Sequence, residues 1–396
     1  QVTQSSGCMK PKDYLTNKKF CPMPWTGLMY NVDGKVKNCI RSANEIGNIQ
    51  DTDIKDILTG ELNTQTQDNM LCGKPGVNCS PCYDLEKQDK TVDMSIISDR
   101  VFYLKELRDV SLDTYDTTGT HELHTIDVRW SNLCNMACVY CGTQFSSKWA
   151  SELGRKIDTP TEQQQQNFKD YIFSNAKQLK HVYMAGGEPL LMKENIELLE
   201  LLKQVNPDVN LRINTNLSKV DTNVFDLICG FKDVHWTVSC ETTHEEYEYI
   251  RYGGSWKDFE DNLVTIQKLD HRISFNMLHF LLNYNSIFAC IDYFKQQGVH
   301  NNSFIIGPML TPTYLNICNL PDNVLQCIKL ELTKRINEHP GFLLENSYRN
   351  MLKYLDTPFE KNLSQSFKEL QIMDKRRNLD SSKIFLDLYK IGNNNG

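Results

Sequence analysis

The segment Asn132–Thr143 reads Asn-Leu-Cys-Asn-Met-Ala-Cys-Val-Tyr-Cys-Gly-Thr and contains three cysteines in C-x3-C-x2-C spacing. These cysteines are Cys134, Cys138 and Cys141. Before the segment, Ile126–Ser131 alternates apolar and polar residues, which predicts a strand, and after it Phe145–Leu153 can begin a helix. We therefore expect the three thiols on a loop at the carboxyl end of a strand, where barrel enzymes keep their chemistry.

Three thiolates this close together can hold three corners of a cubane [4Fe-4S] cluster, which normally takes four cysteines. The loop has no fourth cysteine, so one iron would stay open for an outside ligand, as a site of chemistry requires. The alternative is a three-cysteine zinc site completed by a histidine. His121 and His124 lie nearby in the sequence, but both precede the strand and should fall at its opposite end.

The composition limits the class of protein. A length of 396 residues favours two to three domains, and a net charge of −7 without a basic run gives no support for nucleic-acid binding. No stretch approaches about eighteen uninterrupted apolar residues, so we expect no membrane span. Disulfide frameworks scatter their cysteines through short chains, whereas the fourteen cysteines here are clustered, which favours metal–sulfur ligation in a reducing cytoplasm.

A second group of cysteines lies in residues 1–90. Leu28–Val32 and Lys35–Ile40 read as two strands joined by a tight turn at Asp33-Gly34. The hairpin should bring two thiols together, and a proline-containing turn around Pro81 should supply two more, so that four ligands close a metal site without Cys72. The four are Cys21, Cys39, Cys79 and Cys82. A four-cysteine zinc ribbon is the alternative.

Strand and helix patterns alternate between residues 126 and 310, which predicts β/α units with parallel strands and an α/β fold. The six expected strands are Ile126–Ser131, His181–Ala185, Val209–Asn214, Asp233–Ser239, Ile273–Phe280 and Ser303–Ile306. The expected helices are Glu162–Lys177, Lys193–Gln204, Thr222–Ile228, Trp256–Lys268 and Ser286–Gln297.

Two regions remain, and the one that follows the β/α units carries no chemical motif. Residues 91–125 read as a linker, in which Val101–Leu107 can form a helix. Residues 311–396 read as a helical C-terminal region, and its Lys375-Arg376-Arg377 run is expected to be solvated surface. The four helices expected in this region are Asp322–Glu338, Glu345–Leu355, Glu360–Met373 and Ser382–Lys390.

Small and polar residues follow several of the expected strands. Gly186-Gly187-Glu188-Pro189 directly follows the second strand, where the glycines let the backbone approach a ligand and Glu188 can accept from an ammonium group. Asn214 and Asn216 end the third strand. Ser239, Cys240 and Glu241 end the fourth.

The C-x3-C-x2-C loop, with aromatic Tyr140 before its last cysteine, resembles the radical S-adenosylmethionine (SAM) superfamily. That resemblance implies a partial (β/α)6 barrel of the TIM type and an open iron that binds SAM. Reduction of the cluster then cleaves SAM to methionine and a 5′-deoxyadenosyl radical, and the cofactor carries the radical chemistry.

The resemblance also assigns roles to the residues at the strand ends. The Gly186–Pro189 turn matches the family motif that holds the methionine amine of SAM. The small polar groups suit the ribose hydroxyls and the SAM carboxylate, and Arg251 matches an arginine that pairs with that carboxylate. These polar groups include Asn214, Asn216, Ser239 and Glu241.

The N-terminal cysteines are similar to the auxiliary-cluster modules of this superfamily, which are called twitch with one cluster and SPASM with two. The run of further cysteines that a second cluster needs is absent, so the pattern favours a twitch-like module with one auxiliary [4Fe-4S] cluster. These modules usually follow the barrel, whereas this one precedes it.

The implied activity is hydrogen abstraction from a C–H bond of a peptide or protein, with the auxiliary cluster in electron transfer. The same chemistry on a sugar, cyclitol or nucleotide is one alternative, and a zinc- or cluster-stabilised binding protein is another. The enzyme would need an electron donor such as flavodoxin or ferredoxin, and we expect neither a membrane nor a nucleic acid as partner.

Overall fold

The computed structural model describes residues 19–76, 79–87, 98–106, 121–338 and 340–393. The chain divides into two compact units, which we treat separately. The first unit comprises Gln1–Leu133, Arg155–Ile213 and Thr222–Val234. The second comprises Cys134–Gly154, Asn214–Asp221 and His235–Gly396.

All six strands expected between residues 126 and 310 are present, and their neighbours within each unit are parallel. In the first unit β4 pairs with β5 and β5 with β6, and in the second β7 pairs with β8 and β8 with β9. The bounds are β4 Thr125–Val128, β5 His181–Met184, β6 Asn210–Thr215, β7 Val234–Ser239, β8 Arg272–His279 and β9 Phe304–Pro308. The α/β class and the partial (β/α)6 arrangement are therefore confirmed.

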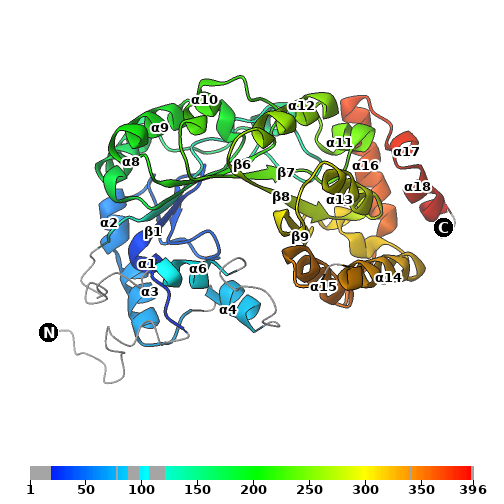
Figure 1. The fold of residues 1–396 in the computed structure, drawn as a ribbon, viewed down its shortest axis with the longest axis horizontal. Coiled ribbons are helices and arrows are strands. Elements are labelled where there is room, and N and C mark those ends of the chain that lie inside the picture. Colours follow the sequence, from blue (N-terminus) through cyan, green and yellow to red (C-terminus); the bar gives the residue numbers. More distant parts are fainter. Residues whose placement is uncertain (1–18, 77–78, 88–97, 107–120, 339, 394–396) are drawn as a thin grey trace. The chain divides into compact units, whose positions relative to one another are not determined.

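The helices between these strands begin and end within a few residues of the predicted positions. In the first unit α8, α9 and α10 cover the sheet (Figure 1). The bounds are α7 Ser147–Glu152, α8 Glu162–Ser174, α9 Glu194–Val205, α10 Asn223–Cys229, α11 His244–Ile250, α12 Trp256–Gln267 and α13 Ser286–Gln296. Short 3-10 turns lie at η5 Ala176–Gln178, η6 Pro189–Leu191, η7 Leu281–Asn283, η8 Asn301–Ser303, η9 Thr313–Leu315 and η10 Ile317–Asn319.

Helix α12 illustrates why these segments fold as they do. The Ser255 hydroxyl accepts a hydrogen bond from the Asp258 N–H and caps the first turn. Apolar residues then recur at helical spacing and form one buried face. The buried residues are Trp256, Phe259, Leu263 and Ile266.

The N-terminal strands belong to the same sheet as the β/α strands of the first unit. Strand β1 (Gly27–Tyr30) runs parallel to β4, and β2 (Lys35–Lys37) and β3 (Gly47–Asn48) follow antiparallel. The predicted turn is present, since Gly34 has φ +78° and its N–H donates to the Asn31 carbonyl at 2.8 Å. The N-terminal segment is therefore joined to β4 through a strand, although it precedes the β/α units in the chain.

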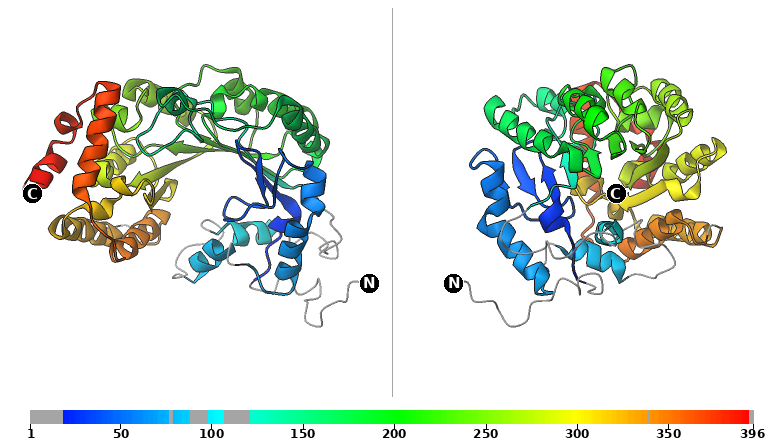
Figure 2. Two further views of the ribbon diagram at one scale, coloured as in Figure 1. Left: turned by 180° about the vertical axis from the view of Figure 1, so that it is seen from behind. Right: turned by 60° about the vertical axis from the view of Figure 1, so that its left-hand side comes forward.

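Several short helices of the described residues accompany these strands in the first unit, and Figure 2 shows this part of the chain in blue and cyan. Their bounds are α1 Met23–Thr26, α2 Ile54–Thr59, α3 Glu61–Leu71, α4 Ser80–Glu86 and α6 Asp99–Glu106. The expected turn around Pro81 is wrong, because Cys79 caps α4 and Cys82 lies within it. A proline in the first turn of a helix needs no N–H partner, so Pro81 starts this helix rather than ending it.

The C-terminal region is helical as predicted, in the second unit. Its helices are α14 Asp322–Glu338, α15 Leu343–Leu355, α16 Leu363–Arg377, α17 Ser381–Ile384 and α18 Leu386–Asn393. One prediction was wrong in detail: the single helix expected at Ser382–Lys390 is broken at Phe385, whose φ of −102° and ψ of 53° are not helical.

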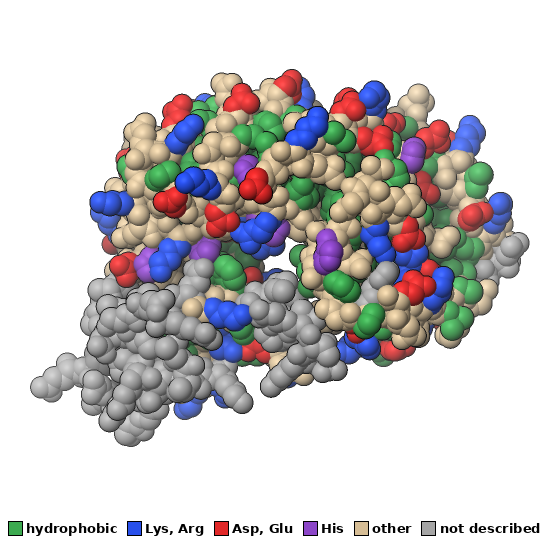
Figure 3. All heavy atoms as spheres, in the orientation of Figure 1, with side chains coloured by type: hydrophobic (Ala, Val, Ile, Leu, Met, Phe, Trp, Pro, Cys, Tyr) green, Lys and Arg blue, Asp and Glu red, His purple; other side chains and the backbone are tan. Residues whose placement is uncertain are grey.

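The surface carries both signs of charge. On the face drawn in Figure 3, basic and acidic side chains of the described residues are interspersed. Among the described residues, no helix is both long and apolar enough to cross a membrane.

We predict that Tyr30 contributes to stability through its ring and not through its hydroxyl. The residue is fully buried and its ring stacks on Phe168 at 4.3 Å, but its hydroxyl has no hydrogen-bond partner among the described residues. Tyr30→Ala should lower the free energy of unfolding by about 3–5 kcal/mol. Tyr30→Phe should leave it unchanged or raise it, because it removes a desolvated, unpaired hydroxyl. Denaturant titration of the iron-free protein measures both, and a loss in Tyr30→Phe comparable to that in Tyr30→Ala would contradict the prediction.

Candidate iron–sulfur and SAM sites

The cysteine loop of the second unit is held by backbone hydrogen bonds to the end of α11. The Ala137 N–H donates to the Tyr252 carbonyl at 2.8 Å, and the Val139 N–H donates to the Ile250 carbonyl at 2.8 Å. A further bond, from the Cys141 N–H to the Cys138 carbonyl at 2.9 Å, closes a turn between two of the thiols. The backbone between Cys134 and Cys141 is thus fixed at several points.

The first turn of α7 braces the same loop with side chains. The Ser147 hydroxyl accepts from the Cys134 N–H at 3.1 Å and donates to the Cys134 carbonyl at 3.2 Å. The Ser146 hydroxyl donates to the Met136 carbonyl at 2.6 Å, and the Trp149 indole N–H donates to the Cys138 carbonyl at 2.7 Å. The sequence motif did not point to these three side chains.

Arg377 of α16 reaches this brace from the C-terminal region. Its guanidinium lies 4.5 Å from the ring centroids of both Trp149 and Tyr252, and its Nε donates to the Glu152 carboxylate at 3.1 Å. The side chain is 1% exposed, so the expectation that Arg377 is solvated surface was wrong. The spacing of the buried residues on α16 could have revealed it. These residues are Leu370, Met373, Asp374 and Arg377.

Two residues predicted to contact SAM form an ion pair with each other. Arg251 donates to both oxygens of Glu241, at 2.9 and 2.7 Å, and both side chains are buried. Tyr140 donates its hydroxyl to the same carboxylate at 3.0 Å, and its ring lies 5.9 Å from the guanidinium. The carboxylate of Glu241 thus neutralises the Arg251 guanidinium.

An amide network surrounds the first cysteine. The Asn216 side-chain N–H donates to the Cys134 Sγ at 3.8 Å and to the Asn135 side-chain oxygen at 3.2 Å. Asn135 in turn donates to the Ser218 hydroxyl at 2.9 Å. The Asn214 side-chain oxygen, in contrast, is buried without a hydrogen-bond partner among the described residues. A buried oxygen without a hydrogen-bond partner is suited to accept a hydrogen bond from a ligand.

Ser239 is the last residue of β7 and is paired in register with Asn276 of β8. Cys240, which follows it, is fully buried and its thiol donates to the Thr242 carbonyl at 3.2 Å. Cys240 is therefore engaged within the protein and is not directed toward an open site.

The Gly186–Pro189 turn of the first unit packs against the chain that leads into the cysteine loop. The Glu188 N–H donates to the Leu133 carbonyl at 2.7 Å, and Leu133 immediately precedes Cys134 in the sequence. A side chain on Gly187 would place its Cβ 2.2 Å from that carbonyl oxygen, so only glycine permits this approach. Gly186 has φ +110°, a conformation that also favours glycine. Glu188 is buried, and its carboxylate accepts from the Leu190 N–H that starts η6.

The four N-terminal cysteines line one cavity in the first unit. Cys21, Cys39, Cys79 and Cys82 share its wall with Met70, Tyr83, Arg41 and Arg100. Arg100 comes from α6, within the expected linker, and no sequence signal marked it. Cys72 is disulfide-bonded and lies outside this wall.

Burial favours the protonated form of one thiol in each of the two cysteine groups. It raises the pKa of Cys138 to about 12 against the lowering effect of Arg251, and it raises the pKa of Cys39 to about 12. A metal ligand must be a thiolate. The charge of bound iron therefore has to drive deprotonation, and cluster assembly at either site should release protons.

The zinc alternatives require ligands that converge on one ion. Among the described residues, no three Cys, His, Asp or Glu side chains are placed to hold a single metal ion. In a cubane each thiolate binds its own iron, so its ligands are more widely spaced. His121 lies at the amino end of the strands, where its ring contacts the Gly27 carbonyl at 3.2 Å, and burial lowers its pKa to about 4.

We predict that Gly187→Ala disturbs the cysteine loop because its Cβ would collide with the Leu133 carbonyl. It should lower the free energy of unfolding by about 1–3 kcal/mol and reduce the iron bound at the loop. Gly142→Ala is the matched control, since a Cβ there meets nothing within 4 Å. It should change stability by less than about 0.5 kcal/mol. Denaturant titration and iron analysis test this, and equal behaviour of the two variants would refute it.

We predict that Arg377→Ala costs about 3 kcal/mol of unfolding free energy, because it leaves the largely buried Glu152 carboxylate with only the more exposed Arg376 as partner and empties the space between two rings. Arg376→Ala is the control, since Arg376 is more exposed and binds the same carboxylate at 3.2 Å. Its cost should stay below about 1 kcal/mol. Thermal unfolding of the two iron-free variants measures the difference, and equal losses would contradict the role given to Arg377.

Comparisons with known proteins agree with this geometry. Residues 128–294 match the family model of the radical SAM superfamily, and residues 21–85 match SPASM, an iron–sulfur cluster-binding domain. The first range contains the cysteine loop, and the second contains all four N-terminal cysteines.

Individual relatives are more distant. A 7-carboxy-7-deazaguanine synthase of Clostridium acetobutylicum is 38% identical over 85 residues, which are 21% of this chain and 33% of that protein. The solved structure of native anSMEcpe with bound AdoMet is 17% identical, with 54% of this chain and 60% of that chain covered and a TM-score of 0.42. Streptococcus suis SuiB bound to precursor peptide SuiA is 13% identical, with 73% and 64% covered and a TM-score of 0.42.

The matched part thus spans a third of that curated relative and about 60% of that first solved chain. The two family models cover the two cysteine groups and the strands β5 to β8, and they imply a [4Fe-4S] cluster, SAM and an auxiliary iron–sulfur site. The chain therefore carries a radical SAM domain at residues 128–294 and a SPASM-type iron–sulfur cluster-binding domain at residues 21–85.

Proposed function

We propose that Cys134, Cys138 and Cys141 hold the SAM-binding [4Fe-4S] cluster. The observation that carries this proposal is the way the loop is built: three thiols and no fourth, with backbone and side-chain bonds at Ala137, Val139 and Cys134. When bound, the cluster and SAM supply a 5′-deoxyadenosyl radical that removes hydrogen from a C–H bond.

The chain's own residues would position SAM around this loop. Glu188 and the backbone of Gly186 and Gly187 would bind the methionine amine, since this turn offers a carboxylate and permits close backbone approach. The unpaired oxygen of Asn214 would accept from a ribose hydroxyl, and Ser239 would lie at the neighbouring strand end. Arg251, with Glu241 and Tyr140, would place a buried cation beside Cys138 and keep the loop in position.

We also propose that Cys21, Cys39, Cys79 and Cys82 hold one auxiliary [4Fe-4S] cluster. Four thiols in one cavity wall satisfy the ligand count of a closed cluster and leave no iron open for substrate. This favours electron transfer over substrate ligation as its role. An electron donor such as flavodoxin or ferredoxin would reduce the enzyme in a reducing compartment, the cytoplasm.

The substrate that we propose is a peptide or protein side chain. The support is the SPASM match at residues 21–85, since enzymes with such modules act mostly on peptides or proteins. The segment shared with a 7-carboxy-7-deazaguanine synthase favours a second candidate, a nucleotide-like small molecule. Anaerobic incubation with SAM, dithionite and each substrate class, followed by mass spectrometry, separates the two.

We predict that the two thiol sets act independently in iron binding. Cys79→Ala with Cys82→Ala should remove about four of about eight irons, abolish product formation and retain uncoupled SAM cleavage, because radical generation needs only the other cluster. Replacing Cys134, Cys138 and Cys141 with alanine should abolish 5′-deoxyadenosine formation. Iron analysis and chromatography of the cleavage products measure both. Reductive SAM cleavage by the triple variant would overturn the loop assignment, and zinc at both sites in the parent would overturn the proposed function.

A further inference from the structure

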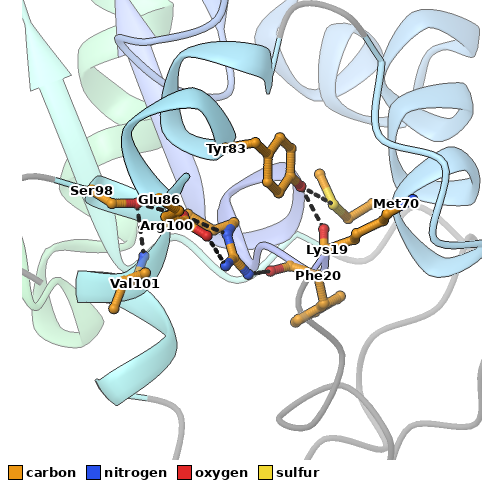
Figure 4. A network of polar contacts seen from close by, with 8 residues as sticks. All are labelled: Lys19, Phe20, Met70, Tyr83, Glu86, Ser98, Arg100 and Val101. Atoms are coloured by element: carbon orange, nitrogen blue, oxygen red, sulfur yellow. Dashed lines mark hydrogen bonds and ion pairs between the residues drawn. The ribbon is translucent and has the colours of Figure 1, made fainter. Parts of the chain in front are cut away.

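The three chain segments that carry the N-terminal thiols are all bound to one short stretch, Ser98–Arg100, at the start of α6. Figure 4 shows Arg100 between the Glu86 carboxylate and the Phe20 carbonyl, with Ser98 on the same carboxylate. These residues lie outside the cysteine motif and outside the matched range 21–85, with Phe20 at its border and Glu86 just beyond it.

The first set of contacts holds the chain segment that contains Cys21. Arg100 Nη1 donates to the Phe20 carbonyl at 2.9 Å, one residue before Cys21. The ring of Tyr83 lies 5.3 Å from the Arg100 guanidinium, and the Tyr83 hydroxyl bonds to the Lys19 carbonyl at 2.5 Å. The backbone on the amino side of Cys21 is therefore fixed by side chains from two helices.

The second set of contacts holds helix α4, which carries Cys82 and begins next to Cys79. Arg100 Nε donates to one oxygen of Glu86 at 2.9 Å and Nη2 bonds to the other, while the Ser98 hydroxyl donates to Glu86 at 2.7 Å. The Arg100 side chain is 7% exposed, so this two-point ion pair is largely removed from solvent screening. Glu86 lies one helical turn beyond Cys82.

The third set of contacts holds the chain segment that contains Cys39. Asp99 accepts from Arg41 Nε at 2.7 Å, and the Arg41 N–H donates to the Cys39 Sγ at 3.2 Å. Ser98 and the Arg100 N–H also lie against the Cys82 thiol, where both lower a pKa that burial raises more strongly. Residues 98–100 thus contact the surroundings of two thiols and the chain beside a third.

We propose that Ser98–Arg100 is a clamp that assembles the auxiliary thiols and sets the reduction potential of their cluster, with Arg100 as its main positioning residue. This inference rests on the proposed auxiliary cluster at Cys21, Cys39, Cys79 and Cys82. Adding an electron makes the cluster and its thiolates more negative, so a nearby cation favours reduction and a nearby carboxylate opposes it. Arg100 and Asp99 should therefore shift the potential in opposite directions, which a purely structural contact would not do.

The test uses the full chain with Cys134, Cys138 and Cys141 changed to alanine, so that the remaining iron belongs to the auxiliary site. Arg100→Gln should speed iron loss to a chelator by about tenfold or more, because outer contacts of metal ligands contribute on that scale. It should also move the midpoint potential to more negative values, since Glu86 loses its cation. Arg100→Lys should keep the potential close to that of the parent and lose iron at an intermediate rate.

Asp99→Asn keeps the side-chain size and should move the potential to more positive values, because it removes a carboxylate near Cys39 and Cys82. It also serves if Arg100→Gln fails to fold. Arg349→Gln is the matched control, since it breaks an arginine–glutamate pair in the second unit, whose arginine side chain is 53% exposed. It should change neither quantity. The potentials come from redox titration followed by electron paramagnetic resonance.

The clamp proposal would be overturned if Arg100→Gln lost iron at the rate of the parent and had the same midpoint potential. It would also be overturned if Arg100→Gln and Asp99→Asn shifted the midpoint potential in the same direction. Absence of iron from the triple-alanine parent would instead overturn the auxiliary cluster itself, and the clamp with it.

Discussion

The pairing of strand β4 on both of its edges is the constraint from which the first unit is built. β4 hydrogen-bonds to β1 on one side and to β5 on the other, with both neighbours parallel to it. β1 brings the N-terminal thiols to the amino end of this strand, since Cys21 precedes β1 and Cys39 follows the returning β2. The chain beyond the carboxyl end of β4 leads through Leu133 to Cys134. In the sequence, this four-residue strand thus lies between the two groups of thiols.

The fold could be predicted well because its signals are local. Alternation in Ile126–Ser131 and helical spacing in Trp256–Lys268 each lie within one element, and the strand ends then locate the polar residues. The helix at Ser80–Glu86 was missed because C-x2-C with a proline looks like a turn, and Pro81 acts as a helix start only when a packed helix follows. The pairing of β1 with β4 could not be predicted either. Neither the segment at Gly27 nor the segment at Thr125 contains a local sequence pattern that indicates which strand it pairs with.

The proposed metal ligands could be predicted from the sequence, whereas the residues that surround them could not. Close cysteine spacing points to a ligand set, because few other uses place thiols so close. The groups around the thiols act across long separations: Arg100 meets Phe20 across 80 positions, and Arg377 meets Glu152 across 225. Arginine is common on surfaces, so its burial is decided by tertiary packing. Arg251 shows the same limit, since its partner Glu241 was expected beside it as a second ligand of SAM.

The position of Arg377 in the chain has a consequence for the order of biosynthesis. Every described group that contacts the N-terminal thiols lies before residue 107, so that cavity can form early in translation. The support of the cysteine loop includes a guanidinium that emerges from the ribosome more than 230 positions after Cys141. Chains fold from the N-terminus as they are made. The Cys134–Cys141 loop therefore acquires its full support only when synthesis is almost complete. A chain that stops short of α16 carries all seven thiols but leaves Trp149 and Tyr252 without the cation between them.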